Sequence, residues 1–322
     1  PRRRPSLDAF RERAGISVHY TEEINDNDEF FGKIGPALMN GQPVDRDLVV
    51  VSDWMAARFV RLGWVQKMDR AAQANVAGHL DPQLLRPAFD PGRLHSVPWQ
   101  SGITGIAYNR RRLGRELRST RQLWDADLRG KVTLLSGLDE AVPLLMQGDG
   151  ADVTRWTQDD FHAVADRIEG LVRRKHIRRF TGNDYIKDLA GGDVLACQAY
   201  SGDVIQLQAD DPDIEFVVPE EGGELWAESL LIPNLARHKA NAEKLIDYYY
   251  ELPVAAQLAA YINYVCPVDG VKDELAKIDP ELAANTLILP DKAMAKKSRA
   301  FRSLSSEEET AYEEKFAKLI GA

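Results

Sequence analysis

The sequence predicts an α/β protein of two domains, and three observations carry that prediction. The chain has 322 residues, enough for two domains of roughly 100–200 residues each. Short β-branched runs alternate with segments of helical periodicity, which is typical of α/β architecture. No internal repeat, low-complexity tract or long linker is visible. The chain is therefore expected to cross between the domains more than once, with hinges near Ser101–Gly105 and Trp226–Glu228.

The predicted strands are short apolar runs. In chain order they are Ile16–Tyr20, Asp47–Val51, Gly105–Tyr108, Lys131–Leu135, Val194–Ala199, Ile214–Val218 and Ser229–Ile232. Each is bounded by polar, glycine or proline residues, so the runs have the length of strands.

Helices are predicted between and after these strands. They are Asp28–Met39, Met55–Leu62, Asp139–Met146, Gln158–Lys175, Tyr185–Gly191, Gly202–Asp210, Ala240–Tyr249, Pro253–Ile262 and Ser305–Leu319. Thr157 stands before the acidic first turn of one helix, and Ser305 before that of the last. Both are predicted N-caps, because a hydroxyl there accepts from free backbone N–H groups.

Composition places the chain among ordinary globular proteins, at 44% hydrophobic and 28% charged. The formal net charge of −9 disfavours nucleic acid as a partner and suits a cationic ligand. No apolar run approaches the ~18–20 residues of a membrane span. The charged start Pro1–Pro5 has no following apolar stretch, so it is not a signal peptide. Either the protein is cytosolic or a leader has already been removed.

Cys197 and Cys266 are the two cysteines, and no spacing in the chain suggests a zinc site. Two buried thiols and one disulfide are both compatible with this pair.

The sequence lacks the common signatures of catalysis. It contains no GxSxG, HExxH or Walker A pattern, and the six histidines are scattered. No cofactor or metal is expected. Aromatic and acidic residues at strand ends, without a nucleophile or proton shuttle, favour binding over turnover.

Three distant segments share one composition: Ser52-Asp53-Trp54, Trp99-Gln100-Ser101-Gly102 and Gly222–Glu228. Each places a tryptophan beside small or acidic residues next to an apolar run. Such a tryptophan is better placed to line a cleft than to fill a core. Aromatic faces and carboxylates together suit an aliphatic cation, since the rings meet its methylenes and the anions its ammonium groups.

With these residues in hand, the chain resembles the bacterial spermidine/putrescine (polyamine) substrate-binding proteins of ABC importers, from about Phe10 to Phe316. The segments that carry the resemblance are Phe10–Ile16, Asp47–Ser52, Leu80–Pro82, Phe89–Gly92 leading to Val97–Trp99, Leu123–Asp125 and Val217–Gly223.

The resemblance implies a two-lobe periplasmic-binding-protein-like fold, with hinge strands and a ligand cleft between the lobes. The expected first lobe comprises residues 1–104 and 227–272, and the second 105–226 and 273–322. It also implies a monomer without cofactor that captures a polyamine and delivers it to membrane permease subunits. The expected location is extracytoplasmic, in the periplasm or lipid-anchored at the outer face of the cytoplasmic membrane.

Site residues follow from the resemblance position by position. The ligand-binding residues it implies are Ser52, Trp54, Glu140, Tyr200, Trp226, Glu228 and Tyr264. Proximity or segment composition adds Asp53, Trp99, Ser101, Asp139, Thr181 and Asp203, and the resemblance adds Arg302.

The chain departs from the family pattern at several positions. No Asn-Trp-x-x-Tyr motif precedes Phe10, and both a piece of a longer chain and a divergent member fit that departure. Gly137 and Gly182 stand where an acid and a polar contact are common, and Arg302 where some members have glutamine. Three alternatives stay open: a receptor for another amine or for a zwitterion whose carboxylate meets Arg302, a sensor subunit impaired in binding, and a hydrolase using Asp139 or Glu140. The hydrolase would need a second carboxylate at ~5–9.5 Å.

Overall fold

The computed structural model describes residues 5–24 and 27–321, and within them the chain divides into two compact units. Unit 1 takes in the chain up to Ser101, with Ala227–Ile262 and Cys266–Ala284. Unit 2 comprises Gly102–Trp226, Asn263–Val265 and the chain from Asn285 onward. The sequence predicted that the chain passes from one lobe to the other at 104/105, 226/227 and 272/273. In the structure, the chain passes between the units at 101/102, within the long strand β2, and at 226/227, within β7.

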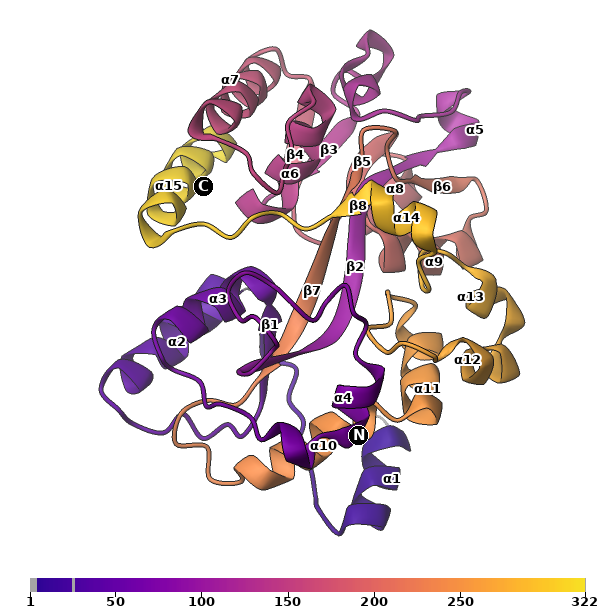
Figure 1. The fold of residues 1–322 in the computed structure, drawn as a ribbon. Coiled ribbons are helices and arrows are strands. Elements are labelled where there is room, and N and C mark those ends of the chain that lie inside the picture. The colour runs from indigo at the N-terminus through magenta and orange to yellow at the C-terminus, as the bar shows by residue number, and fades with distance from the viewer. Residues whose placement is uncertain (1–4, 25–26, 322) are drawn as a thin grey trace. The chain divides into compact units, whose positions relative to one another are not determined.

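Unit 1 surrounds a short run of sheet with helices. Its elements are α1 (Pro5–Ala14), α2 (Asn27–Met39), β1 (Val49–Ser52), α3 (Asp53–Arg61), α4 (Ala74–His79), the first part of β2 (Ser96–Asn109), the last part of β7 (Gly223–Leu231), α10 (Lys239–Tyr249), α11 (Leu252–Ile262), α12 (Lys272–Ile278) and α13 (Pro280–Ala284). Strand β1 pairs with β7 in antiparallel register, from Val49 opposite Leu231 to Ser52 opposite Glu228. The strand order β1-β7-β2 follows (Figure 1).

Unit 2 is the larger sheet with helices packed on it. Its elements are α5 (Arg110–Leu113), β3 (Val132–Leu135), α6 (Leu138–Asp149), α7 (Gln158–Arg173), β4 (Ile177–Thr181), α8 (Tyr185–Gly191), β5 (Ala196–Tyr200), α9 (Ser201–Asp210), β6 (Ile214–Val217), α14 (Lys292–Lys297), β8 (Ser298–Arg299) and α15 (Ser306–Ile320). Strand β3 runs parallel to β4 and β5, whereas β2 is antiparallel to β5 and β6. In Figure 1, α15 (yellow) lies beside α7.

Separate apolar clusters stabilise the two units. In unit 1, Val51 and Phe59 pack with Leu231 in one cluster, and Phe10 packs with Tyr248 in another. In unit 2 the main cluster gathers the inner faces of α6 and α7 over β3 and β5. Each unit therefore has its own core, as a domain requires.

The predicted helices are all present, with ends that differ by at most three residues. Thr157 and Ser305 each form a capping box at the start of α7 and α15, as their sequence context predicts. The predicted strand Ile16–Tyr20 is wrong, because those residues adopt no regular secondary structure. Residues Ile16 and Val18 instead pack as irregular chain against the cluster that contains Phe10.

Several elements were not predicted: α1, α4, α5, α12, α13, α14, β4 and β8. Strand β4 escaped prediction because two arginines, Arg178 and Arg179, occupy its middle and are exposed. A strand pattern read from apolar residues does not reveal such a segment.

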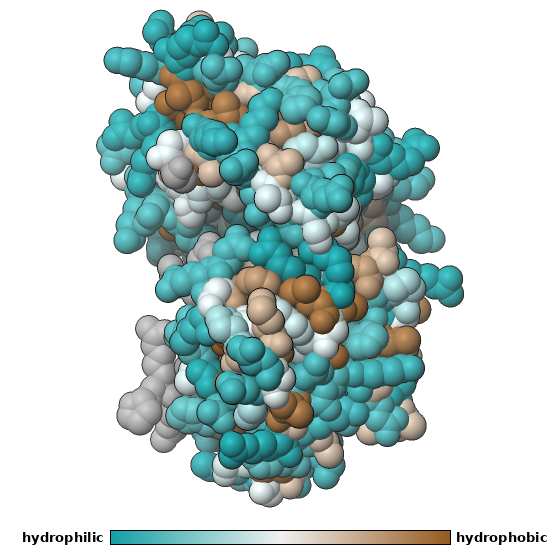
Figure 2. Space-filling view, turned by 90° about the vertical axis from the view of Figure 1, so that its left-hand side faces the viewer, coloured by the Kyte–Doolittle hydropathy of each residue, from teal (hydrophilic) through white to brown (hydrophobic). Residues whose placement is uncertain are grey.

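Apolar side chains that reach the surface are scattered over both units. The face drawn in Figure 2 is mostly hydrophilic, with small apolar groups between the polar ones. The large exposed apolar residues are Tyr20, Met39, Leu62, Leu85, Val172, Leu235, Tyr261 and Ile278. None of the helices within 5–24 and 27–321 is both long enough and apolar enough for a membrane span.

Candidate functional site

Glu228 of unit 1 is held by a chain of polar contacts. Strand register places Ser52 opposite Glu228, so their side chains share a face of the sheet. The Ser52 hydroxyl donates to Glu228 Oε1 at 2.9 Å, and Asn27 Nδ2 donates to the same Ser52 oxygen at 2.9 Å. Two predicted site residues are thereby brought together across 176 positions of sequence. Asn27, at the start of α2, orients the pair and was not predicted.

Asp53 has a different setting from its neighbour Ser52. Its carboxylate accepts from the guanidinium of Arg93 at 2.9 Å and from the Ser229 hydroxyl. Arg93 is only 1% exposed, so an anion beside it offsets the cost of burying its charge. Asp53 therefore has a structural role in unit 1 that the sequence did not indicate.

Two of the three predicted cleft tryptophans pack against unit 1 cores. Trp54 lies in α3 against the cluster around Phe59, with the Arg58 guanidinium 5.5 Å from its ring centre. Trp99 lies inside β2, with its ring edge-on to Tyr249 at 4.7 Å. Both side chains are only partly buried at the edges of these clusters, and a ligand-facing role for them stays a prediction.

In unit 2, Trp226 lies between two tyrosines. Its ring centre is 5.4 Å from that of Tyr200 and 5.7 Å from that of Tyr264, both at steep angles. Such tilted aromatic pairs are favoured by the ring quadrupoles. Three predicted residues from β5, β7 and the loop after α11 thus form one aromatic group, defined here as the Trp226 cluster.

Two glycines make room for the Trp226 cluster. A Cβ on Gly102 would lie 2.3 Å from the indole of Trp226, and a Cβ on Gly202 would lie 2.3 Å from the ring of Tyr264. Any larger residue at either position would displace the ring. The close approach explains why both positions are glycine.

Asp203 holds the tyrosines of this cluster. Its carboxylate accepts from the hydroxyls of Tyr264 and Tyr185, each at 2.6 Å. The Tyr185 hydroxyl in turn accepts from the backbone N–H of Tyr200 at 3.0 Å. Asp203, predicted only by proximity, is therefore a positioning residue for the aromatic rings.

The acids of α6 lie next to Tyr200. Asp139 and Glu140 are in the first helical turn, where the helix dipole favours negative charge. The Glu140 carboxylate accepts a hydrogen bond from the Tyr200 hydroxyl and lies against Gly137, whose Cβ would lie 2.6 Å from Glu140 Oε2. Burial, followed by the charge of Glu140, raises the pKa of Tyr200 well above its usual value. The missing side chain at Gly137 is thus what lets Glu140 adopt this position.

Glu224 is a further acid beside these residues that sequence reasoning missed. It is 4% exposed, and its Oε2 has no hydrogen-bond partner among the described residues. Burial raises the pKa of this carboxyl well above its usual range, and the charges of Asp139 and Glu140 raise it further. The available signal was its place two residues before Trp226, which puts both side chains on one face of β7.

Arg302 is engaged within unit 2 rather than free to meet a ligand. Its guanidinium lies 3.9 Å from the centre of the Trp156 ring and donates to both carboxylate oxygens of Glu308, at 2.7 and 3.1 Å. The two remaining predicted polar residues, Ser101 and Thr181, are buried.

We expect Glu308→Gln to lower the free energy of unfolding by about 1 kcal/mol at pH 7, since the ion pair is partly exposed. Arg302 lowers the pKa of Glu308 to about 2. The stabilisation is therefore present above the unfolded value near 4.5 and is lost as pH falls toward 2. Urea unfolding at pH 7 and pH 3 measures this, with Glu307→Gln in the same helical turn as the control. An equal loss at both pH values would contradict the ion-pair origin.

Both cysteines are buried and unbonded, Cys197 in unit 2 and Cys266 in unit 1. The disulfide considered from the sequence is therefore not formed. Burial raises the pKa of the Cys266 thiol to about 12 and that of Cys197 further, so both stay protonated and behave as small apolar residues.

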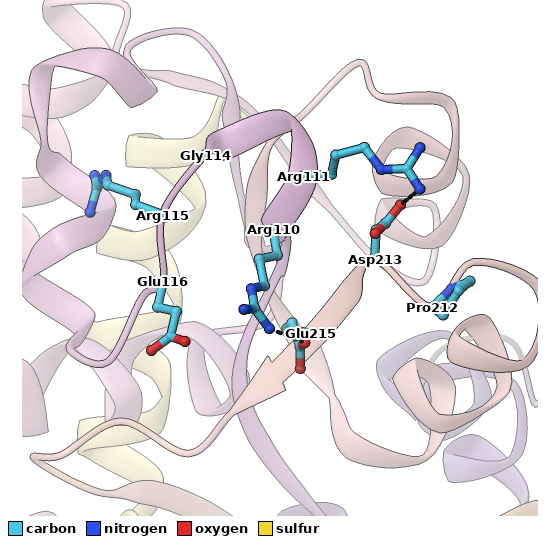
Figure 3. A pocket seen from close by; sticks show the side chains of 8 residues that line it. All are labelled: Arg110, Arg111, Gly114, Arg115, Glu116, Pro212, Asp213 and Glu215. Atoms are coloured by element: carbon cyan, nitrogen blue, oxygen red, sulfur yellow. Dashed lines mark ion pairs between the residues drawn. The ribbon is translucent and has the colours of Figure 1, made fainter.

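A surface pocket of about 430 Å³ in unit 2 involves none of the predicted site residues (Figure 3). It is lined by Arg110, Arg111, Gly114, Arg115, Glu116, Pro212, Asp213 and Glu215. Arg111 pairs with Asp213, and Arg110 lies 3.6 Å from Glu215. Its cations are thus already paired with acids. No group of metal-binding side chains occurs in the part of the chain that the structure describes.

Comparison with known proteins gives consistent results. Residues 6–288 match the model of a family described as bacterial extracellular solute-binding proteins. The chain is 26% identical over 314 residues to the spermidine/putrescine-binding periplasmic protein of Escherichia coli, covering 97% of this chain and 87% of that one. It is also 26% identical over 293 residues to spermidine/putrescine-binding periplasmic protein 1 of Haemophilus influenzae, covering 91% and 79%.

The fold agrees with that of a solved structure. The spermidine/putrescine ABC transporter substrate-binding protein of Streptococcus pneumoniae superposes with a TM-score of 0.83 at 21% identity, covering 98% of this chain and 94% of that one. The predicted fold class and the resemblance inferred from sequence are both confirmed.

Proposed function

Because the chain belongs to the family of bacterial extracellular solute-binding proteins, we propose that it binds a polyamine of the putrescine or spermidine type. It acts outside the cytoplasm, as a monomer, and delivers the ligand to the membrane permease of an ABC importer. The names of its relatives support this ligand class. The observation that carries the proposal is the Trp226 cluster, in which an indole lies between two tyrosines beside the carboxylate of Glu140.

The chemistry of that group suits a flexible aliphatic chain with ammonium ends. An aromatic face over an ammonium or its neighbouring methylenes contributes ~0.5–2 kcal/mol, depending on desolvation. Charge-assisted hydrogen bonds from an ammonium to a carboxylate are roughly twice as strong as neutral ones. Glu140, beside the Trp226 cluster in unit 2, supplies an anion for such an ammonium group. Glu228 in unit 1 is proposed separately as a ligand-binding acid.

The alternatives raised by the sequence receive less support. A zwitterionic solute required the guanidinium of Arg302 for its carboxylate, and that group is bound to Glu308 and stacked on Trp156. A hydrolase would require Glu140 to exchange protons with substrate, whereas its carboxylate contacts the Tyr200 side chain. We therefore propose binding without turnover.

A thermal-shift panel of putrescine, spermidine, spermine and several amino acids tests the proposal. A ligand at 100 times its dissociation constant adds about 2.7 kcal/mol to stability. For a chain of this size, that raises the unfolding midpoint by several degrees, at about 2–4 °C for each kcal/mol. A rise with a polyamine and none with the amino acids is expected. A flat polyamine response, followed by no heat of binding in calorimetry, would reject the proposal.

A further inference from the structure

Glu224 is a buried acid to which the function proposed so far gives no role. It lies in β7, where the Thr104 side chain favours its charged form, but that effect is smaller than the cost of burial. Its Oε2 has no hydrogen-bond partner among the described residues, although the residue is only 4% exposed. A buried charge without a partner is strongly disfavoured. The free protein therefore keeps this carboxyl in its neutral, protonated form.

The position of Glu224 connects it to the Trp226 cluster. Glu224 and Trp226 are two residues apart in β7 and so point to the same side of the strand. Thr104, which neighbours Glu224, is the register partner of Tyr200 between β2 and β5. Directly opposed residues of an antiparallel pair share a face, so the acid lies on the side of the sheet that carries Tyr200.

The charged groups around Glu224 come from several elements. Asp139 and Glu140 of α6 are the charges that act on it, and both are acids. Tyr200 of β5 is the neighbouring phenol, itself protonated. From β8, the register partner is Arg299, but its guanidinium lies 3.5 Å from Asp152. Glu224 thus has two carboxyls as neighbours, and none of the groups named here is a cation directed at it.

We propose that Glu224 is a third carboxyl of the ligand site, protonated in the free protein, which releases its proton when an ammonium group of the ligand binds beside Asp139 and Glu140. The inference rests on the proposed function, because it requires a cationic ligand at the Trp226 cluster. The step is balanced: the carboxyl O–H breaks, its proton passes to buffer, and the resulting carboxylate is neutralised by the ammonium. The ligand keeps its own protons, since aliphatic ammonium groups titrate near pH 10.

A proton released on binding has two measurable consequences. The dissociation constant falls as pH rises, by up to about tenfold per pH unit while the free protein holds the proton. The apparent heat of binding also depends on the ionisation heat of the buffer, with a slope equal to the number of protons released. We expect about one proton per ligand at pH 7.

Calorimetry with putrescine and with spermidine, in phosphate and in Tris at pH 7, is the test. The wild-type protein should show a buffer-dependent heat, and Glu224→Gln should bind with a heat that no longer depends on the buffer. Glutamine keeps the shape and removes the titrating group. Glu220→Gln, an exposed acid in the same unit, is the matched control and should behave as wild type.

The outcomes separate this inference from the function on which it rests. Binding of a polyamine with no proton release by the wild type would overturn the role of Glu224 and leave the proposed function standing. Release that persists in Glu224→Gln would overturn it equally, since another group would be the source. Absence of polyamine binding to the wild type would reject the proposed function and this inference with it. Even where Glu224→Gln fails to fold, absence of proton release by the wild type would overturn the role of Glu224.

Discussion

Glu228→Gln is expected to weaken polyamine binding by about 30-fold or more. Truncating one partner of a desolvated charge pair costs about 2–5 kcal/mol, and each 1.4 kcal/mol is about tenfold in affinity. The glutamine carbonyl can still accept from the Ser52 hydroxyl, so the contact at 2.9 Å and the fold of unit 1 are expected to persist. Isothermal calorimetry with spermidine and putrescine measures the loss.

The matched control for this variant is Glu12→Gln. Glu12 lies in α1 of the same unit and is exposed, so the substitution removes the same charge from the protein without touching the chain of contacts at Ser52. An equal loss in both variants would mean that the long-range field of the protein, and not Glu228 itself, favours the cation. Unchanged affinity in Glu228→Gln would remove Glu228 from the site.

Trp226→Ala is the second substitution with a large expected effect, a loss of about tenfold or more in polyamine affinity. The indole supplies a π face worth ~0.5–2 kcal/mol to a desolvated ammonium. Its removal also deprives Tyr200 and Tyr264 of the ring that lies between them. Trp226→Phe, which keeps an aromatic face, should recover part of the affinity.

Trp124→Ala provides the comparison for this second variant. Trp124 is also a half-buried tryptophan of unit 2, packed against the main cluster and edge-on to His176. Its loss should lower the unfolding midpoint and leave the dissociation constant unchanged. The opposite pattern for Trp226, with lower stability but wild-type affinity, would show that its ring only fills the core.

Sequence patterns with a local cause predicted much of the fold. The periodicity of Tyr185–Gly191 predicts helix α8 at its observed bounds, and Thr157 predicts the start of α7, because capping depends on residues within one turn. The strand predicted at Ile16–Tyr20 is wrong because a strand depends on a distant partner and not on its local pattern alone. Its alternating pattern is compatible with a strand, but no neighbouring strand supplies the hydrogen bonds that would make it one.

For the candidate site, the sequence indicated the residue types but not their partners. The composition of the segments around Ser52, Trp226 and Glu228 was enough to indicate aromatic and acidic residues suited to an aliphatic cation. Residue types do not reveal partners, however. Arg302 was expected to bear on the choice of ligand, yet its contact with Glu308 directs it into unit 2. Asp53 could have bound a cationic ligand, but its carboxylate accepts from the guanidinium of Arg93, 40 positions away in sequence.

By itself, the sequence determined the alternation of strands and helices, the relationship to solute-binding proteins and the set of aromatic and acidic residues from which a site is built. Tertiary structure alone decided how those residues are used. Ser52 meets Glu228 only because β1 pairs with β7, and Glu224 becomes a buried acid only because β7 is covered in unit 2. The physical reason is that propensity and capping act over a few residues, whereas burial and charge pairing depend on neighbours brought together from distant parts of the chain.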